Sequence, residues 1–279
     1  MRDFNTIVYH GDCPDGFCAA FVASKCYPGA QHIPATYGKP IDDAVIQNRD
    51  VLVVDFSWKK AETQRIASLA RYIRILDHHK TAEAELAGLP YAYFDMNRSG
   101  AQLAWDHCFP AKQPRPWYVD YVADRDLWRW QLPESKTVSA YLMALPHTIE
   151  AWAALDSISV ETAIANGRGA RAQVEHYVDK VTAQAYSGRW NGHTVAIVNA
   201  PYPNISDVAN QLCERGAQIG LGWFMRGDMQ IQFSLRSIGD LDVSTLAKEH
   251  GGGGHKNASG FQIPMSKGLA FLRALTRKP

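Results

Sequence analysis

The stretch Arg74-Ile75-Leu76-Asp77-His78-His79-Lys80 decides the fold that the sequence predicts. Residues 72–76 are few, mostly apolar and β-branched, which indicates a buried strand. One aspartate and two histidines follow this strand directly. Ligands of an open parallel sheet bind outside the carboxyl ends of its strands, where such side chains bind a metal or transfer a proton. By itself the short triplet is equally consistent with a polar loop.

Two earlier strands end in the same way. Residues 6–9 indicate a strand that ends at His10, and residues 51–54 indicate a wholly apolar strand that ends at Asp55. The latter is typical of the centre of a parallel sheet. Right-handed crossovers would bring the carboxyl ends of all three strands to one edge. This repeated placement of polar residues at strand ends predicts a functional site.

The remaining pattern predicts an α/β protein. We expect an N-terminal parallel-sheet domain with flanking helices, a helical linker and a smaller C-terminal α/β domain with a mixed sheet. The boundary is expected in the turn-rich residues 187–192, which gives a catalytic domain over 1–186 and a substrate-binding domain over 187–279. Ser99 is expected to cap a helix whose N-terminus would suit an anion. In the first domain and linker we also expect strands near 32–36 and 91–94 and helices near 17–26, 59–69, 101–105, 117–130, 137–157 and 160–186, the last interrupted near 167–169. In the second domain we expect strands over 193–198, 219–225 and 229–235 and helices over 206–215 and 243–250.

Composition favours a cytoplasmic enzyme or binding protein. The chain has 279 residues, of which 46% are hydrophobic and 20% charged. A net charge of +1 gives no global basic field of the kind that holds long duplex DNA. The five cysteines are odd in number and lack CxxC spacing, which argues against a disulfide framework or a structural zinc site. We see no signal peptide and no apolar run long enough to span a membrane, so no membrane partner is expected.

The polar residues of the first domain exceed what one metal ion needs. Crowded carboxylates repel one another unless cations neutralise them. Oxygen and imidazole ligands without thiolate favour manganese, magnesium or iron over zinc. Two divalent cations about 3.5–4 Å apart are the usual device for in-line attack on phosphorus. The set comprises His10, Asp12, Asp15, Asp55, Asp77, His78, His79 and Asp124.

The second domain carries hydrogen-bond donors beside glycines. Residues 251–254 are all glycine, and Gly253 and Gly254 would let backbone N–H groups approach an anion closely, although a flexible linker is the alternative. Arg236 follows a strand and can bind a phosphate with two hydrogen bonds. The other donors are His255, Lys256, Asn257 and Ser259. A metal site in one domain and an anion site in the other predict a metal-dependent phosphoester hydrolase.

Five ordered motifs give a resemblance to a known family, the DHH phosphoesterases with a DHH-associated C-terminal domain. The family includes RecJ-type exonucleases, nanoRNase-type oligoribonucleases and linear dinucleotide phosphodiesterases. The resemblance spans nearly the whole chain. The motifs are His10-Gly11-Asp12-Cys13-Pro14-Asp15-Gly16, Val53-Val54-Asp55, Asp77-His78-His79, Ala123-Asp124-Arg125-Asp126-Leu127-Trp128 and residues 252–260.

The resemblance implies a role for each motif. The metal ligands it implies are His10, Asp12, Asp15, Asp55, His78 and Asp124. It further implies that Asp55 bridges two ions, that His79 faces the scissile phosphate and that Asp77 orients its neighbouring histidine. Arg236, His255 and Lys256 would hold the terminal phosphate or nucleotide of the substrate. The spacing from His10 to the two following aspartates is shorter than in the best-known nanoRNases, and the fourth motif offers Asp126 as well as Asp124, of which we prefer Asp124.

The expected activity is hydrolysis of short single-stranded oligonucleotides or linear dinucleotides to nucleoside monophosphates, with two divalent cations, Mn²⁺ in preference to Mg²⁺. Three alternatives stay open: a phosphatase acting on adenosine 3',5'-bisphosphate, a single-strand exonuclease, and a catalytically silent nucleotide-binding module. A homodimer is one oligomeric state that we consider.

Overall fold

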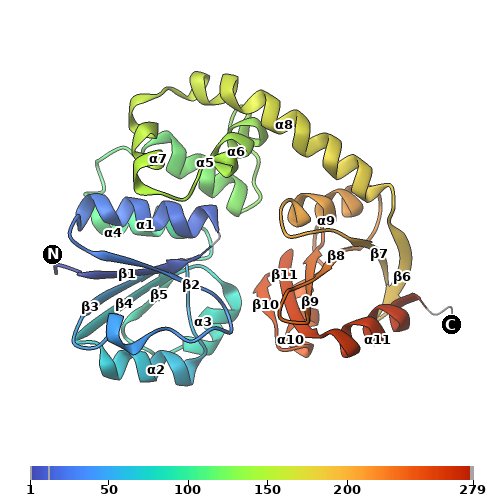
Figure 1. Ribbon diagram of the computed structural model, residues 1–279, viewed down its shortest axis with the longest axis horizontal. Helices are drawn as coiled ribbons and strands as arrows, with labels where there is room; N and C mark the ends of the chain where they lie inside the picture. The colour runs from blue at the N-terminus through green and yellow to red at the C-terminus, as the bar shows by residue number, and fades with distance from the viewer. Residues whose placement is uncertain (1, 12, 277–279) are drawn as a thin grey trace. The chain divides into compact units, whose positions relative to one another are not determined.

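The computed structural model describes residues 2–11 and 13–276, so Asp12 lies outside the described residues. The chain divides into two compact units, Met1–Arg171 and Ala172–Pro279 (Figure 1). The division falls inside one long helix, α8 (Val160–Thr182), earlier than the boundary expected after residue 186. The division of catalytic and substrate-binding roles between two domains stays a prediction.

The first unit is built on a five-stranded parallel sheet. Its strands are β1 (Thr6–His10), β2 (Gln31–Ala35), β3 (Asp50–Val54), β4 (Tyr72–Asp77) and β5 (Ala92–Phe94). They lie in the order β2-β1-β3-β4-β5, each parallel to its neighbours. The apolar β3 is central, and β2, which contains Pro34, lies at an edge, as the sequence predicts. The three strands that end in polar residues are therefore adjacent.

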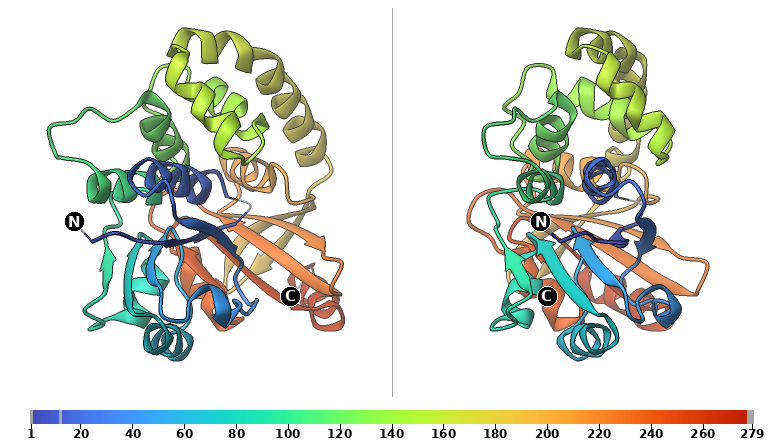
Figure 2. Two further views of the ribbon diagram at one scale, coloured as in Figure 1. Left: turned by 60° about the vertical axis from the view of Figure 1, so that its left-hand side comes forward. Right: turned by 90° about the vertical axis from the view of Figure 1, so that its left-hand side faces the viewer.

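Helices cover both faces of this sheet (Figures 1 and 2). Along β3 the side chains alternate: Leu52 and Val54 join the core under α1 and α4, whereas Val51 and Val53 join the core over α2 and α3. This period of two explains why the strand is apolar throughout. The helices of the unit before α8 are α1 (Pro14–Cys26), α2 (Lys60–Leu69), α3 (Lys80–Leu86), α4 (Gly100–Cys108), α5 (Trp117–Asp126), α6 (Ser135–Ala144) and α7 (Ile149–Ala153), with 3-10 turns at Asp43–Val45 and Ala154–Ser157.

The second unit contains a mixed six-stranded sheet. Its strands are β6 (Tyr186–Trp190), β7 (His193–Asn199), β8 (Ile219–Met225), β9 (Gln230–Arg236), β10 (Gly253–His255) and β11 (Ala258–Pro264). Their order is β10-β11-β9-β8-β7-β6, and only the β7–β8 pair is parallel. Its helices are α9 (Ile205–Glu214), α10 (Val243–Glu249) and α11 (Met265–Thr276). The predicted α/β class with a mixed second sheet is confirmed.

Two elements of the second unit differ from the expectation. Residues 187–190, expected in a boundary loop, form β6, and α11 was not predicted. The two are linked, because a Cβ atom on Gly188 would lie 2.5 Å from the carbonyl oxygen of Leu275 in α11. The turn-like composition of β6 therefore reflects close packing of a helix, with Trp190 buried in the core beside it.

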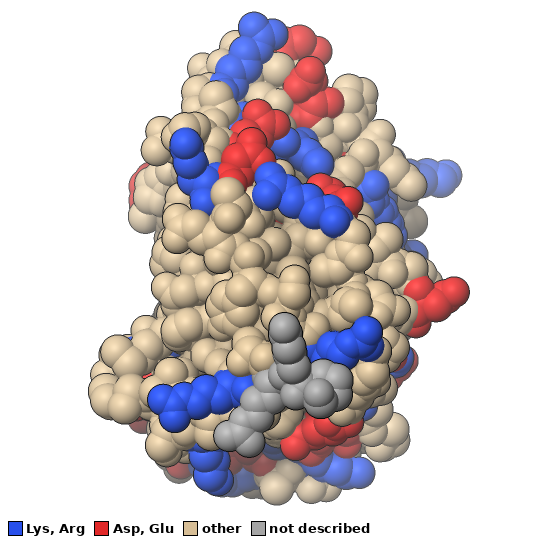
Figure 3. Space-filling model, turned by 90° about the vertical axis from the view of Figure 1, so that its right-hand side faces the viewer, with Lys and Arg blue, Asp and Glu red and all other residues tan. Residues whose placement is uncertain are grey.

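The surface charge and the apolar character of the helices agree with what the composition of the sequence predicts. Basic and acidic side chains are interspersed on the face drawn in Figure 3, in keeping with the net charge of +1. None of the helices within residues 2–11 and 13–276 combines the length and apolar character needed to cross a bilayer.

The long helix α8 runs through its glycines without the expected interruption. Gly167 is buried, and a Cβ atom there would lie 2.3 Å from the carbonyl oxygen of Thr137 in α6. Gly169 is exposed and has no neighbouring atom within 4 Å of such a Cβ atom. The first glycine therefore serves helix packing, whereas the second only lowers helix propensity.

We expect Gly167→Ala to lower the free energy of unfolding by about 1–3 kcal/mol, because the methyl group overpacks the contact between α8 and α6. The matched variant Gly169→Ala should leave stability unchanged or raise it by up to about 1 kcal/mol. Urea unfolding followed by circular dichroism measures both. Equal effects of the two variants would contradict the packing role of Gly167.

Candidate metal-binding site

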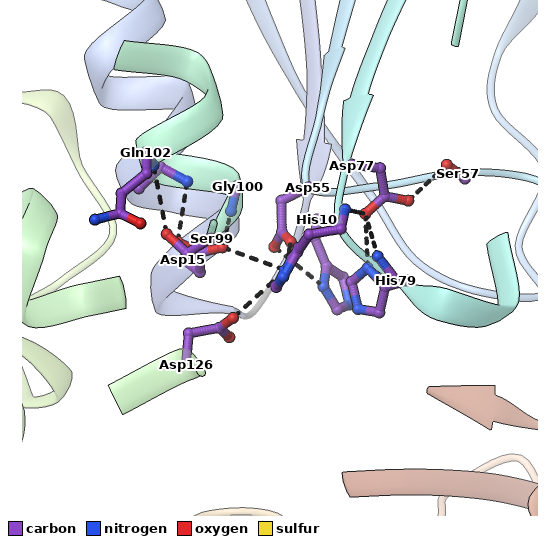
Figure 4. A network of polar contacts seen from close by, with 12 residues as sticks. His10, Asp15, Asp55, Ser57, Asp77, His79, Ser99, Gly100, Gln102 and Asp126 are labelled. Atoms are coloured by element: carbon purple, nitrogen blue, oxygen red, sulfur yellow. Dashed lines mark hydrogen bonds and ion pairs between the residues drawn. The ribbon is translucent and has the colours of Figure 1, made fainter. Parts of the chain in front are cut away.

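Five polar side chains converge at the carboxyl edge of the first sheet. His10 is the last residue of β1, Asp55 follows β3, and His78 follows β4. Asp15 lies in the first turn of α1, and Asp126 ends α5. Figure 4 shows His10, Asp15, Asp55 and Asp126 directed toward one another. The parallel strand order thus gathers residues far apart in sequence.

Asp55 is the centre of the cluster. Its Oδ1 lies 3.0 Å from Nε2 of His78, and its Oδ2 lies 3.6 Å from Nδ1 of His10. Its side chain is 1% exposed, and its backbone has φ of 56°, in the left-handed region that non-glycine residues rarely adopt. Such local strain is concentrated at functional sites.

His78 brings two further carboxylates to the cluster. Its Nε2 lies 3.4 Å from Oδ2 of Asp126 and 3.6 Å from Oδ2 of Asp15. The imidazole is 1% exposed. One imidazole therefore faces three carboxylates, counting Asp55, in a place removed from water.

Asp15 also fixes the N-terminus of α4. Its two oxygens accept hydrogen bonds from the amides of Gly100 (2.6 Å) and Ala101 (3.0 Å). Ser99 is fully buried and accepts a hydrogen bond from the amide of Gln102, so it caps the helix as predicted. The anion at this helix N-terminus is thus Asp15 of the protein. Ser99 therefore caps α4, and its role toward substrate stays a prediction.

Gly100 is the reason that Asp15 and Asp55 can approach α4. A Cβ atom on Gly100 would lie 2.4 Å from Cβ of Asp55 and 2.9 Å from Oδ2 of Asp15. Any side chain there would displace both carboxylates.

Asp77 orients the neighbouring histidine. Its Oδ1 accepts hydrogen bonds from Nδ1 of His79 (2.7 Å) and the amide of His78 (2.7 Å), and its Oδ2 accepts one from the hydroxyl of Ser57 (2.6 Å). Burial would lower the pKa of His79, but the charge and hydrogen bond of Asp77 raise it. Because Oδ1 of Asp77 accepts a hydrogen bond from Nδ1 of His79, Asp77 is placed to orient the His79 ring.

The charges of the cluster are unbalanced. Burial would raise the pKa of Asp55, but hydrogen bonds and charges from His10 and His78 lower it. Burial and the charges of Asp126 and Asp55 raise the pKa of Asp15. Burial opposes the charged form of His78, yet Asp126 and Asp55 raise its pKa to about 10. One imidazolium cannot neutralise the carboxylates of Asp15, Asp55 and Asp126, so the site favours an added cation.

The donor set fits divalent cations. Among the described residues, Nδ1 of His10, Oδ2 of Asp55 and Oδ2 of Asp126 are buried without a hydrogen-bond partner. Such groups are costly unless another ligand satisfies them. Two groups of three side chains each have ligand atoms within 4.8 Å of one another. The first group is Asp15, His78 and Asp126, and the second is His10, Cys13 and Asp55. These are oxygen and nitrogen ligands with one sulfur, in two groups that share no residue.

The fourth motif contributes differently from the expectation. Both oxygens of Asp124 accept hydrogen bonds within its own unit: Oδ1 from the amide of Gln131, Oδ2 from the amide of Leu132 and the hydroxyl of Ser135. Asp124 thus ties α5 to the start of α6. Asp126, the alternative that the sequence left open, is the residue of this motif that reaches His78, at 3.4 Å, which favours it over Asp124 as the candidate ligand. The ligand role of either residue stays a prediction.

Residues predicted to bind substrate in the second unit are only partly brought together. In the sheet register His255 pairs with Ala258, which pairs with Arg236. The two side chains therefore share one face, two strands apart, about 10 Å. Arg236 donates from its guanidinium to the hydroxyl of Ser206 and to the carbonyl of Leu235.

The other predicted residues have local partners. Lys256 Nζ lies 3.0 Å from Oδ1 of Asp240, and the amide of Asn257 donates to Ser237 Oγ at 2.9 Å. Gly253 and Gly254 form β10 and pair with Gly260 and Ser259, so the glycine run permits close packing of a hairpin instead of a linker. Their role toward substrate stays a prediction.

Sequence reasoning gave no role to Cys13, Ser57 and Gly100, and it offered Asp126 but preferred Asp124. Of these residues, only Cys13 and Asp126 lie inside a motif of the sequence analysis, and their position in the motif is the signal by which sequence reasoning could have found them. Ser57 and Gly100 lie outside the motifs, and only the packing of the fold gives them a role.

The sequence comparisons bear on both units. Residues 182–278 match the family described as the DHHA1 domain. The uncharacterized protein R106 of Acanthamoeba polyphaga mimivirus is 29% identical over 298 residues, which cover 95% of this chain and 68% of that protein.

Solved structures share the fold. An exopolyphosphatase-related protein from Bacteroides fragilis superposes with a TM-score of 0.55 at 15% identity, covering 97% of this chain and 90% of that one. The pGpG-specific phosphodiesterase PggH from Vibrio cholerae gives 0.52 at 14% identity, with 97% of each chain covered. RecJ from Thermus thermophilus, solved with Mn²⁺, gives 0.51 at 15% identity, covering 97% of this chain and 51% of RecJ.

Residues 182–278 thus carry a DHHA1 domain, and the chain as a whole shares the two-sheet fold of the pGpG-specific phosphodiesterase and of RecJ. The resemblance found in the sequence motifs is confirmed.

We expect Asp126→Asn to weaken Mn²⁺ binding at least about tenfold, an effect that even outer-sphere partners of metal ligands can reach. Asp124→Asn should instead keep Mn²⁺ affinity and lower the free energy of unfolding by about 1–3 kcal/mol, because its amide cannot accept all three hydrogen bonds. Isothermal titration with Mn²⁺ and urea unfolding measure the two effects. The opposite pattern would return the ligand position to Asp124.

Proposed function

We propose that this protein is a metal-dependent phosphodiesterase that hydrolyses short oligonucleotides or linear dinucleotides to nucleoside monophosphates. The observation that supports the proposal most is the group of buried ligand atoms of His10, Asp55 and Asp126 that make no hydrogen bond among the described residues. The fold shared with a pGpG-specific phosphodiesterase and with a Mn²⁺-bound RecJ adds to it.

The residues that would hold two divalent cations, Mn²⁺ or Mg²⁺, are His10, Asp15, Asp55, His78 and Asp126, with Asp55 shared between them. Asp12, which lies outside the described residues, completes the set that the family resemblance implies. Bound divalent cations supply charge stabilisation on a phosphoryl group and lower the pKa of water.

His79 would act on the substrate directly. Its Nδ1 donates to Asp77, which fixes the ring plane and directs Nε2 toward hydrogen bonding with a phosphoryl oxygen. The Ser57 hydroxyl holds Asp77 in turn. This chain of contacts lets His79 stabilise negative charge that develops during attack on phosphorus.

In the second unit, Arg236 and His255 share a sheet face and would bind the terminal phosphate or base of a short substrate. A site of this kind selects short or single-stranded ends. The near-neutral net charge favours small anions over long duplexes.

The decisive experiment is a Mn²⁺-supported assay on pGpG, on oligonucleotides from two to about ten nucleotides, and on adenosine 3',5'-bisphosphate. We expect turnover of the shortest substrates and its loss in Asp55→Asn, because asparagine tolerates the left-handed backbone but cannot neutralise cations. Length-independent cleavage would indicate an exonuclease, and preference for the bisphosphate a phosphatase. Nucleotide binding without turnover would indicate a silent module, and full activity of Asp55→Asn would exclude the proposed site.

We expect Arg236→Ala to raise KM for pGpG about tenfold with little change in kcat, since it removes a charged hydrogen bond to the bound substrate. The control is Arg226→Ala, in the turn between β8 and β9, where the arginine side chain pairs with Asp228. Unchanged KM in the Arg236 variant would remove this residue from the substrate site.

A further inference from the structure

We propose that the thiol of Cys13 is a ligand of the candidate metal site, on the side formed by His10 and Asp55. This ligand would give the chain affinity for thiophilic divalent cations such as Zn²⁺ and Cd²⁺. The inference rests on the metal site of the proposed function and adds which cations that site selects.

The first observation is a cluster of ligand atoms. One atom each from His10, Cys13 and Asp55 lie within 4.8 Å of one another. Within the described residues, Nδ1 of His10 and Oδ2 of Asp55 are buried and lack a hydrogen-bond partner. Asp55 is 1% exposed, so its unsatisfied oxygen is directed into a site and not toward solvent.

The second observation is the position of Cys13 in the helix. It is the N-cap residue of α1, with φ of −121° and ψ of 128°, and its side chain makes no capping hydrogen bond. Serine, threonine, aspartate or asparagine usually occupy this position because their oxygens cap the helix. The following Pro14 fixes the entry into the helix, which holds the thiol in place.

The chemistry follows from the ligand types. Imidazole and carboxylate alone suit Mn²⁺ or Mg²⁺, whereas an added thiolate shifts preference toward Zn²⁺ and Cd²⁺. When such a cation binds, the S–H bond breaks, the sulfur electron pair forms the bond to the metal, and the proton is released to buffer. Neither oxidant nor reductant is needed.

The chain offers a matched control. Cys26 is the last residue of α1 and, like Cys13, is half-buried, whereas Cys18, Cys108 and Cys213 are buried. Both Cys13 and Cys26 flank the same helix, but only Cys13 lies in the cluster with His10 and Asp55. Serine at position 13 is a better N-cap than cysteine, so Cys13→Ser should fold.

The test is titration of the purified full chain with Cd²⁺, followed by the ultraviolet charge-transfer absorption of a Cd–thiolate bond. We expect this band in the wild type and in Cys26→Ser, and its absence in Cys13→Ser. Affinity for Cd²⁺ should fall at least about tenfold in Cys13→Ser, with a smaller change for Mn²⁺. A band of equal intensity in Cys13→Ser, or Cd²⁺ binding to the wild type without any band, would overturn the proposal.

A second measurement needs no variant. Cys13 and Cys26 are alkylated by a maleimide in the same sample, and peptide mass spectrometry gives each rate. We expect Cd²⁺ to slow alkylation of Cys13 selectively, whereas equal rates with and without Cd²⁺ would contradict ligation. Neither the Cd–thiolate absorption nor the alkylation rate depends on hydrolysis. Cys13 can therefore prove not to be a ligand while Mn²⁺-dependent turnover persists, and turnover can be absent while Cys13 binds Cd²⁺.

Discussion

The placement of one buried carboxylate, that of Asp55, controls the geometry of the whole site. The left-handed backbone directly after β3 turns this side chain between His10 and His78. The same turn brings its Cβ atom against α4, where only glycine fits at position 100. The strained backbone of Asp55 therefore requires glycine at position 100 of α4. Such constraints are common where a site is preorganised.

The electrostatics of the cluster oppose the stability of the empty fold. Asp15 satisfies the N-terminus of α4, and Asp77 is held by Ser57 and two residues of its own loop, so these two carboxylates are compensated. Asp55 and Asp126 keep buried oxygens without a partner among the described residues. The fold thus satisfies the carboxylates that position other groups and leaves without a hydrogen bond one oxygen of each carboxylate that faces the candidate metal site.

Much of this arrangement could be predicted from the sequence, because a parallel sheet places the residues that follow β1, β3 and β4 at one edge. The rest depends on tertiary contacts that pattern cannot express. Asp124 and Asp126 are two positions apart on α5, so they point to nearly opposite sides, and spacing alone could not tell which faces the cluster. Gly167 and Gly188 lie in stretches whose composition predicts a break in regular structure, yet Gly167 is in a helix and Gly188 in a strand. Glycine is needed at both positions because the neighbouring backbone leaves no room for a side chain.

The span of the cluster along the chain ties ligand binding to folding. Its residues run from position 10 to position 126 and come from β1, α1, β3, β4 and α5, so no short fragment contains the set. A cation bound there would contact only the completely assembled first unit, and its binding free energy would add to that of folding. Chelation would then act as a denaturing condition for this unit, and metal supply would influence how much folded protein a cell retains.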